Sequence, residues 1–142
     1  MRYVLDTCVI SDLVAKQPNQ RVLDWIDTLE PEMVYLSVIT IGEIRKGIEK
    51  LPDSKRKTTL REWLEDDLLM RFSGRILPID SDVMLSWGAL IGRLELSGKK
   101  MAAMDSLIAA QVVHGKFCLV TRNEDDFKYA GIRIVNPWSE RE

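Results

Sequence analysis

The chain of 142 residues has two cysteines, one histidine and no long hydrophobic run. Cys8 and Cys118 lie in apolar stretches without metal-ligand spacing, which predicts free thiols rather than a disulfide or a zinc site. No stretch approaches the length of a membrane span, and no cationic segment followed by an apolar one opens the sequence. These absences predict a cytoplasmic protein without membrane contact.

The sequence also lacks an excess of charge of either sign. Lys and Arg number 20 and Asp and Glu 22, which gives a formal net charge of -2. This balance is unlike that of proteins that coat nucleic acid, although it leaves room for a local basic patch. A glycine-rich loop with lysine is absent, which disfavours nucleoside triphosphate binding. The 46% share of hydrophobic residues is enough for the core of one domain, predicted to span residues 1–142.

Short apolar runs alternate with segments of helical periodicity. The strand-like runs are residues 3–5, 33–36, 75–78, 117–120 and 132–135. Asn19 and either Asp80 or Ser81 are predicted to cap helices, and Gly115 is predicted to end one. The packing face of a long helix after Pro52 is predicted to consist of Leu60, Trp63, Leu64, Leu68 and Met70. The alternation predicts an α/β fold with a mostly parallel central sheet of about five strands, flanked by helices.

Four acidic residues stand out by their position relative to these elements. Asp6 directly follows the first strand, and Glu43 lies in the first turns of the helix after the second strand. Asp105 shares a helical face with apolar side chains, so a carboxylate occupies a core-facing position in the first turn of its helix. Asp126 follows the strand at residues 117–120. Taken singly, each residue has a plain structural role open to it, such as a helix cap, a turn residue or a solvated surface residue.

Taken together, these four carboxylates are predicted to meet in the crevice beyond the carboxyl ends of the strands, where open α/β sheets bind ligands. Their mutual repulsion would raise pKa values unless a cation enters. The ligand atoms are hard oxygens, so the expected cation is Mg²⁺, with Mn²⁺ as the alternative, rather than Zn²⁺. A hard cation held by carboxylates suits phosphate chemistry, because it activates water and stabilises charge on the leaving oxygen.

Several segments around these residues form a recognisable ordered set. They are VLDTCVIS at 4–11, SVITIGE at 37–43, DSLIAA at 105–110, LVTRN at 119–123 and DF at 126–127, with GRILP at 74–78 and NPW at 136–138. The set resembles PIN-domain ribonucleases and, more narrowly, the VapC and FitB-like toxins of type II toxin–antitoxin pairs. This resemblance implies a PIN-like fold and a Mg²⁺-dependent endoribonuclease that cuts RNA. It also implies silencing by a small DNA-binding antitoxin, and a homodimer or higher toxin–antitoxin assembly.

The resemblance assigns roles to individual positions. Asp6, Glu43 and Asp105 match the three core acidic residues of these enzymes, which implies that they are catalytic residues and metal ligands. The hydroxyl groups of Thr7 and Thr121 are expected to form supporting hydrogen bonds in the site.

The fourth acidic position has two candidates. FitB-like chains often place an Asp directly after Thr-Arg, where this sequence has Asn123. Other VapC-like chains have Asn there and an Asp before Phe, which corresponds to Asp126. We favour Asp126 as the fourth carboxylate and metal ligand, with Asn123 as a neutral ligand or substrate contact.

An RNA substrate also requires cations near the site. Lys99 and Lys100 lie just before the Asp105 helix and are the preferred RNA contacts, and Arg45 and Lys46 are further candidates. For any single cluster, a solvated helix surface is the plainer interpretation.

Three competing functions can be compared with these residues. A haloacid-dehalogenase-type phosphatase also places an Asp after its first strand, but it requires a second Asp where this sequence has Cys8. A receiver-like signalling domain would require an acidic pair, a central acceptor Asp and a late Lys, and that pattern is absent. The third is a PIN fold that is catalytically weak and acts mainly by binding its antitoxin; the change at Asn123 keeps it open.

Overall fold

The computed structural model of the chain describes residues 1–139. In chain order the elements are β1 Tyr3–Leu5, α1 Thr7–Leu13, α2 Gln20–Asp27, η1 Pro31–Met33, β2 Val34–Ser37, α3 Val38–Glu49, α4 Lys55–Glu62, η2 Trp63–Leu68, α5 Leu69–Arg71, β3 Ile76–Leu77, α6 Ser81–Leu96, α7 Ala103–Gly115, β4 Cys118–Val120, α8 Glu124–Phe127 and β5 Arg133–Val135. Here η1 is a 3-10 turn and η2 is a π-helical segment. The last three residues of the predicted domain, 140–142, lie outside this description. No helix within residues 1–139 has both the length and the apolar character needed to cross a membrane.

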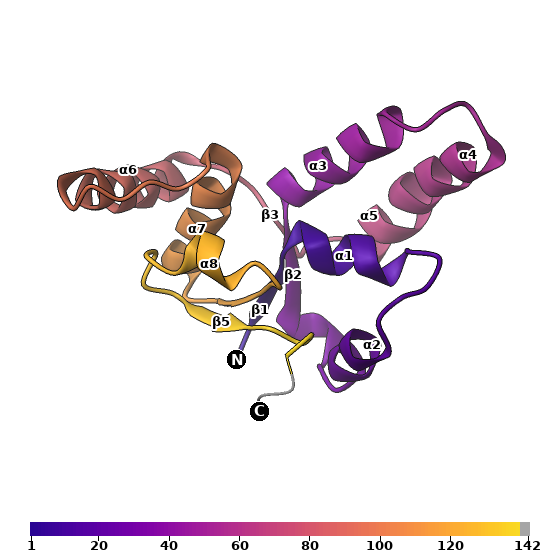
Figure 1. Cartoon of the computed structure of the whole chain (residues 1–142), viewed down its shortest axis with the longest axis horizontal. Helices are drawn as coiled ribbons and strands as arrows, with labels where there is room; N and C mark the ends of the chain where they lie inside the picture. The colour runs from indigo at the N-terminus through magenta and orange to yellow at the C-terminus, as the bar shows by residue number, and fades with distance from the viewer. Residues whose placement is uncertain (140–142) are drawn as a thin grey trace.

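The five strands form a parallel sheet in the order β3-β2-β1-β4-β5 (Figure 1). In the centre of the sheet, Val4 of β1 pairs with Tyr35 of β2 on one side and with Leu119 of β4 on the other. The chain therefore builds β2 and β3 outward from β1, then returns to add β4 and β5 on the opposite side. The order reverses between β1 and β4, which is the point where open α/β sheets bind ligands. The predicted α/β fold with a parallel five-stranded sheet is confirmed.

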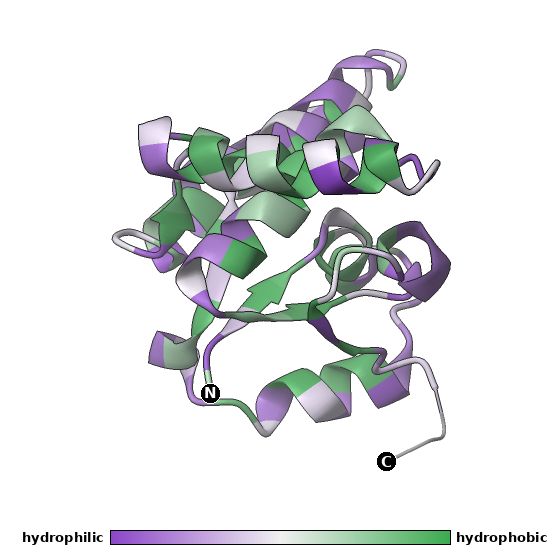
Figure 2. Ribbon diagram, turned by 90° about the vertical axis from the view of Figure 1, so that its left-hand side faces the viewer, coloured by the Kyte–Doolittle hydropathy of each residue, from purple (hydrophilic) through white to green (hydrophobic). Residues whose placement is uncertain are grey.

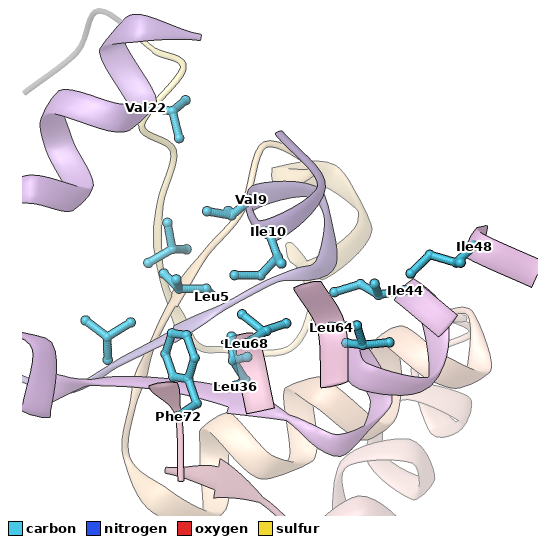
Figure 3. Close-up of a cluster of buried hydrophobic side chains, with 12 residues drawn as sticks. Leu5, Val9, Ile10, Val22, Leu36, Ile44, Ile48, Leu64, Leu68 and Phe72 are labelled. Carbon is cyan, nitrogen blue, oxygen red and sulfur yellow. The ribbon is translucent and has the colours of Figure 1, made fainter. Parts of the chain in front are cut away.

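A separate hydrophobic cluster covers each face of the sheet. Leu5 and Leu36 belong to the cluster formed with α1, α2, α3 and η2 (Figure 3). Val4 and Leu119 point to the opposite face and pack beneath α6 and α7. Because successive strand residues alternate between two buried faces, the strands are mostly apolar, and much of their length appears in green in Figure 2.

Local capping residues fix where several helices begin. The side chain of Asn19 accepts hydrogen bonds from the backbone N–H groups of Arg21 and Val22 at the start of α2. Asp80, rather than Ser81, is the N-cap of α6 and accepts from a backbone N–H in its first turn. Each cap satisfies donors that the first helical turn leaves unpaired.

The long helix made of α4, η2 and α5 departs from a regular helical period. Leu64 and Leu68 are buried as predicted, but Met70 is 70% exposed and Phe72 is buried instead. A π-helical turn spans more residues than an α-helical turn, so the side chains that follow η2 point in a different direction. The predicted packing face is therefore confirmed at Leu64 and Leu68, and at the partly buried Leu60 and Trp63, and it is wrong at Met70.

Gly115 ends α7 as predicted, but for a different reason. The left-handed backbone conformation belongs to the next residue, Lys116, with φ of 57°. A Cβ atom on Gly115 would overlap the ring of Phe117. Close packing of that ring therefore requires glycine at this position.

Candidate active site

Asp6 lies at the end of β1, next to the end of β4. Its Oδ1 accepts a hydrogen bond from the backbone N–H of Thr7, at 2.9 Å, and so caps α1. Its Oδ2 accepts from the hydroxyl group of Thr121, at 2.8 Å. Thr121 directly follows β4, so this bond joins the two strands between which the strand order reverses.

The environment of Asp6 has opposing effects on its charge. The residue is only 5% exposed, and this burial is the main reason that the pKa of Asp6 is raised. The hydrogen bonds from Thr121 and Thr7 lower that pKa, while the negative charges of Glu43 and Asp126 raise it further. The two hydrogen bonds thus partly offset the cost of burying the carboxylate.

Glu43 reaches the same region from α3, which starts directly after β2 with Ser37 as its N-cap. Its Oε1 accepts a hydrogen bond of 2.6 Å from the hydroxyl group of Thr7. The hydroxyl group of Thr40, one helical turn before Glu43, lies 3.0 Å from the same Thr7 oxygen and is fully buried. Thr7 therefore links the start of α1 to α3 and orients Glu43.

Asp105 lies in the first turn of α7 and is partly buried. Within residues 1–139, its side chain has no hydrogen-bond or ion-pair partner. Burial is the main reason that the pKa of Asp105 is raised to about 6, and the charges of the other three carboxylates add to the rise. Near neutral pH this carboxylate therefore carries a charge that the protein does not neutralise.

Asp126 and Asn123 lie in or beside the short helix α8. Both are exposed, and the negative charge of Asp126 acts on both Asp6 and Asp105. Asn123 lies one residue before α8, and its backbone N–H donates to the hydroxyl oxygen of Thr121, at 3.0 Å. Asp126 is thus within electrostatic range of Asp6 and Asp105. Asn123 contacts the acidic site only through the backbone hydrogen bond to Thr121.

The four carboxylates come from the N-cap of α1, the middle of α3, the first turn of α7 and the short helix α8, and they act on one another electrostatically. In the described part of the chain, no three Asp, Glu, His or Cys side chains are already arranged to hold one metal ion. The donor set, carboxylate oxygens with threonine hydroxyls beside them, nevertheless has the chemistry that hard divalent cations require. Asp105, which has no partner within residues 1–139, fits the same group, because a cation beside it would restore its ordinary ionisation.

Two residues that the sequence analysis did not assign to the site also contact its side chains. The sulfur atom of Cys8 lies 3.5 Å from the Thr121 hydroxyl oxygen and 3.9 Å from Asp6 Oδ2. Thr40 contacts Thr7, as described above. The sequence signal for Thr40 is its position three residues before Glu43, which places both on one face of the helix. No comparable signal distinguishes Cys8 from a thiol buried in the core.

The NPW motif lies outside the acidic site but holds α8 in place. The side-chain amide of Asn136 donates to Glu124 of α8, at 2.8 Å, and its oxygen accepts from the backbone N–H of Trp138, at 2.9 Å. The guanidinium group of Arg122 lies 4.8 Å from the centre of a Trp138 ring. These contacts fix the segment that carries Asp126.

The two lysines predicted as preferred RNA contacts precede α7. Both Lys99 and Lys100 are exposed. The Lys99 ammonium group lies 4.6 Å from the ring centre of Tyr129, in the loop after α8. The structure thus brings Lys99 to the segment that follows Asp126.

The second predicted cationic pair lies on α3. Arg45 forms ion pairs with Glu49, at 2.9 Å, and with Glu65, at 2.8 Å. Its charge is therefore already balanced by two carboxylates. Lys46, next to it, is exposed.

Comparison with known proteins adds a family assignment to this geometry. The family described as PIN domain matches residues 3–132. The VapC ribonuclease Y4jK of Sinorhizobium fredii is 42% identical over 135 residues, which cover 95% of this chain and 96% of that protein. The toxin FitB of Neisseria gonorrhoeae is 40% identical over 137 residues, covering 96% and 99% of the two chains. A structure of FitAB bound to an IR36 DNA fragment superposes with a TM-score of 0.93 at 38% identity, covering 99% of this chain and 98% of that one.

Proposed function

This chain belongs to the PIN-domain family, and we propose that it is a divalent-metal-dependent endoribonuclease that acts as the toxin of a type II toxin–antitoxin pair. The proposal is supported by relatives of about 40% identity along nearly the whole chain, which are named VapC ribonuclease and toxin FitB. The observation that carries it is the acidic site between β1 and β4, with an unpartnered Asp105 whose pKa is about 6. The dehalogenase-type phosphatase has no support from the family match.

In this proposal Asp6 and Asp105 are the principal ligands of Mg²⁺ or Mn²⁺, with Glu43 and Asp126 completing the charge. A bound cation of this kind lowers the pKa of water and stabilises negative charge on a leaving oxygen. The chain supplies the orientation, because the hydrogen bonds from Thr7 and Thr121 hold both oxygens of Asp6. Asp105 approaches from α7, with no bond of its own to break within the described residues.

Glu43 is the residue best placed to handle a proton. Its Oε1 is held by the Thr7 hydroxyl at 2.6 Å, so the position of the carboxylate is set before a substrate arrives. Phosphodiester hydrolysis removes a proton from the attacking water and adds one to the ribose oxygen that leaves. Glu43 would orient that water and accept its proton, and Asp126, exposed on α8, would assist through its negative charge.

We assign the chain a cognate DNA-binding antitoxin as partner, and a homodimer or a higher toxin–antitoxin assembly. The support is the similarity to FitAB, whose structure was determined on a DNA fragment. The net charge of -2 suits a partner that carries the cationic DNA-binding surface. An RNA-cutting toxin would meet its substrate in the cytoplasm.

The decisive experiment incubates purified, antitoxin-free protein with structured RNA in Mg²⁺ or in EDTA and maps the cut ends. We expect internal cuts in Mg²⁺ and none in EDTA, with Asp6→Asn and Asp105→Asn prepared identically as inactive controls. Equal cutting in EDTA would overturn the metal assignment. A protein that binds its antitoxin but never cuts RNA would support the catalytically weak alternative.

The antitoxin is tested separately, with the product of the neighbouring gene. An arginine of that partner suits the acidic site, because a guanidinium group binds carboxylates through two parallel hydrogen bonds. Arginine and Mg²⁺ would then compete, and inhibition of the ribonuclease should weaken as Mg²⁺ rises. If the degree of inhibition changes neither with Mg²⁺ concentration nor with the Asp6→Asn substitution, the inhibitory contact lies elsewhere, for example at Lys99 and Lys100.

A further inference from the structure

Tyr129, in the loop between α8 and β5, is an exposed aromatic side chain between two lysines. The ammonium groups of Lys99 and Lys128 lie 4.6 and 5.2 Å from its ring centre, and the residue is 44% exposed. Within residues 1–139, neither lysine has a carboxylate partner. Two unneutralised cations around one exposed ring favour the approach of an anion that also carries a flat surface.

A hollow of about 540 Å³ adjoins Tyr129 and is lined by residues of α6, by Val113 of α7 and by the turn before β5. Arg93 of α6 lines it and brings a third positive charge, and it also has no ion-pair partner among the described residues. Gly131, with φ of 70°, turns the chain two residues after Tyr129 and lines the same hollow. We call Arg93, Lys99, Lys128 and Tyr129 the Tyr129 patch.

The Tyr129 patch lies on chain segments that also carry carboxylates of the acidic site. Tyr129 follows Asp126 by three residues, and Lys99 precedes Asp105 by six residues. Val113, which lines the hollow, is eight residues after Asp105 on α7, or about 12 Å along the helix axis. A strand of a few nucleotides is long enough to reach from the carboxylates to the patch.

We propose that the Tyr129 patch is an accessory subsite for single-stranded RNA, with one base stacked on Tyr129 and the flanking phosphates on the three cations. The proposal rests on the ribonuclease function proposed above. Stacking on an aromatic ring accepts any base, and lysine and arginine neutralise phosphates without reading sequence. An arriving base takes the place of one ammonium group on the ring, because an exposed cation–π contact is weaker than a base–aromatic stack. The displaced lysine then pairs with the adjacent phosphate.

The location of the patch predicts a specific kinetic effect. It lies away from Asp6 and Asp105, so it should hold RNA that extends beyond the cleaved bond without acting on the bond itself. Changes at Tyr129 should therefore raise KM for long single strands and leave kcat unchanged. A substrate of only a few nucleotides should not respond.

The test measures binding of a fluorescent single-stranded RNA of about 12 nucleotides, in EDTA to prevent cleavage, by anisotropy. Tyr129→Leu should raise Kd about five-fold or more, the lower end for one lost stack, while Tyr129→Phe should stay within about two-fold. Lys99→Ala and Lys128→Ala should each lower the salt dependence of binding by about one phosphate contact. Lys16→Ala, which changes an exposed lysine in the turn after α1, is the matched control and should behave as wild type.

The possible results separate this proposal from the function on which it rests. Wild-type affinity in Tyr129→Leu, in a protein that still binds and cuts RNA, overturns the patch alone. A wild-type chain that neither binds nor cuts RNA overturns the ribonuclease function and the patch with it. Unchanged RNA binding combined with altered sedimentation would mark the patch as a contact between protein copies and would also overturn the proposal. If Tyr129→Leu lowers the unfolding temperature, the RNA affinity of the exposed Lys128→Ala variant tests the proposal instead. Wild-type salt dependence in that variant would then overturn the patch.

Discussion

Asp6 and Asp105 belong to the same acidic site but are held in opposite ways. Asp6 is almost fully buried and receives hydrogen bonds on both oxygens, from Thr7 and Thr121. Asp105 is less buried, has no partner among residues 1–139, and its pKa is raised to about 6. The protein itself therefore stabilises the charge of Asp6, whereas the charge of Asp105 is stabilised only when a cation binds beside it.

This contrast separates two roles that carboxylates play in one site. A hydrogen bond to a charged group contributes roughly 1.5–3 kcal/mol, so two such bonds offset much of the cost of burying Asp6. Asp105 has the free-energy cost of burying a carboxylate, without hydrogen bonds from residues 1–139 that would offset it. A cation that binds there would stabilise the folded state as well as the reaction, and the predictions below use this coupling.

The largest effect is expected from removing either charge. Asp6→Asn and Asp105→Asn should each reduce Mg²⁺-dependent RNA cleavage by about 10³-fold or more, because several kcal/mol of charge stabilisation are lost. Their stabilities should differ, however. In metal-free buffer above about pH 6, Asp105→Asn should unfold at a higher temperature than wild type, because it relieves repulsion without losing a hydrogen bond. Near-wild-type cleavage by either variant would contradict the ligand assignment.

Glu43→Gln should have the next largest effect. It keeps the shape and an acceptor for the Thr7 hydroxyl but loses the ability to take up a proton. Single-turnover cleavage should slow by about 10²-fold, the scale of a lost acid–base group, while unfolding is little changed. A rate within two-fold of wild type would remove Glu43 from the proton-handling role.

Asp126 and Asn123 compete for the fourth position, and a smaller effect distinguishes them. Asp126→Asn should slow cleavage by roughly ten-fold, less than Glu43→Gln because its exposed charge is screened by solvent. Asn123→Ala should cost less, since the bond from Asn123 to Thr121 uses the main chain. The reverse order of rates would transfer the fourth position to Asn123.

Thr121→Val tests the strand-end part of the site through stability. The substitution keeps the shape but removes the donor to Asp6 Oδ2 and the acceptor for the Asn123 N–H. Urea unfolding of the metal-free protein should show a loss of about 1–3 kcal/mol. Thr40→Val removes an equally buried hydroxyl that does not touch Asp6, and it should cost less. Equal losses of unfolding free energy in the two variants would mean that the hydrogen bond from Thr121 to Asp6 contributes no extra stability.

The smallest expected effect is a pH dependence of stability that originates at Asp105. Its folded pKa of about 6 lies above the ordinary value of 3.8, so its contribution to stability is fully present below about pH 4 and is lost as pH rises through 6. Metal-free wild type should therefore lose unfolding temperature over this range relative to Asp105→Asn. Added Mg²⁺ should restore more of it at about pH 7.5 than at about pH 5. Parallel pH curves for the two proteins would show that Asp105 does not titrate in this range.

The positions of Asp6 and Glu43 beyond the strand ends can be predicted from the sequence because the signals are local. Asp6 and Glu43 each follow an apolar run, and parallel strands bring their carboxyl ends to one edge of the sheet. The caps Asn19 and Asp80 are likewise readable from residues within one helical turn. For these positions, the neighbouring residues in the sequence are enough to predict the helix or strand and the edge of the sheet where the site lies.

Features that depend on distant packing could not be predicted in the same way. The strand order that places Thr121 beside Asp6 brings together residues 115 positions apart. The reason for Gly115 is the ring of Phe117 rather than its own backbone angle. Met70 leaves the predicted face because a π-helical segment shifts the helical phase, and periodicity assumes a constant one.

The pairing of β1 with β4 also determines when during synthesis the site can form. Asp6 is among the first residues to be made, but its Thr121 partner is added 115 residues later. At typical translation rates this gap lasts roughly 6–23 s. Throughout that interval β4 is missing, so a nascent chain has neither the central strand pairing nor the hydrogen bond to Asp6 Oδ2. The acidic site therefore cannot be complete until most of the chain has been synthesised.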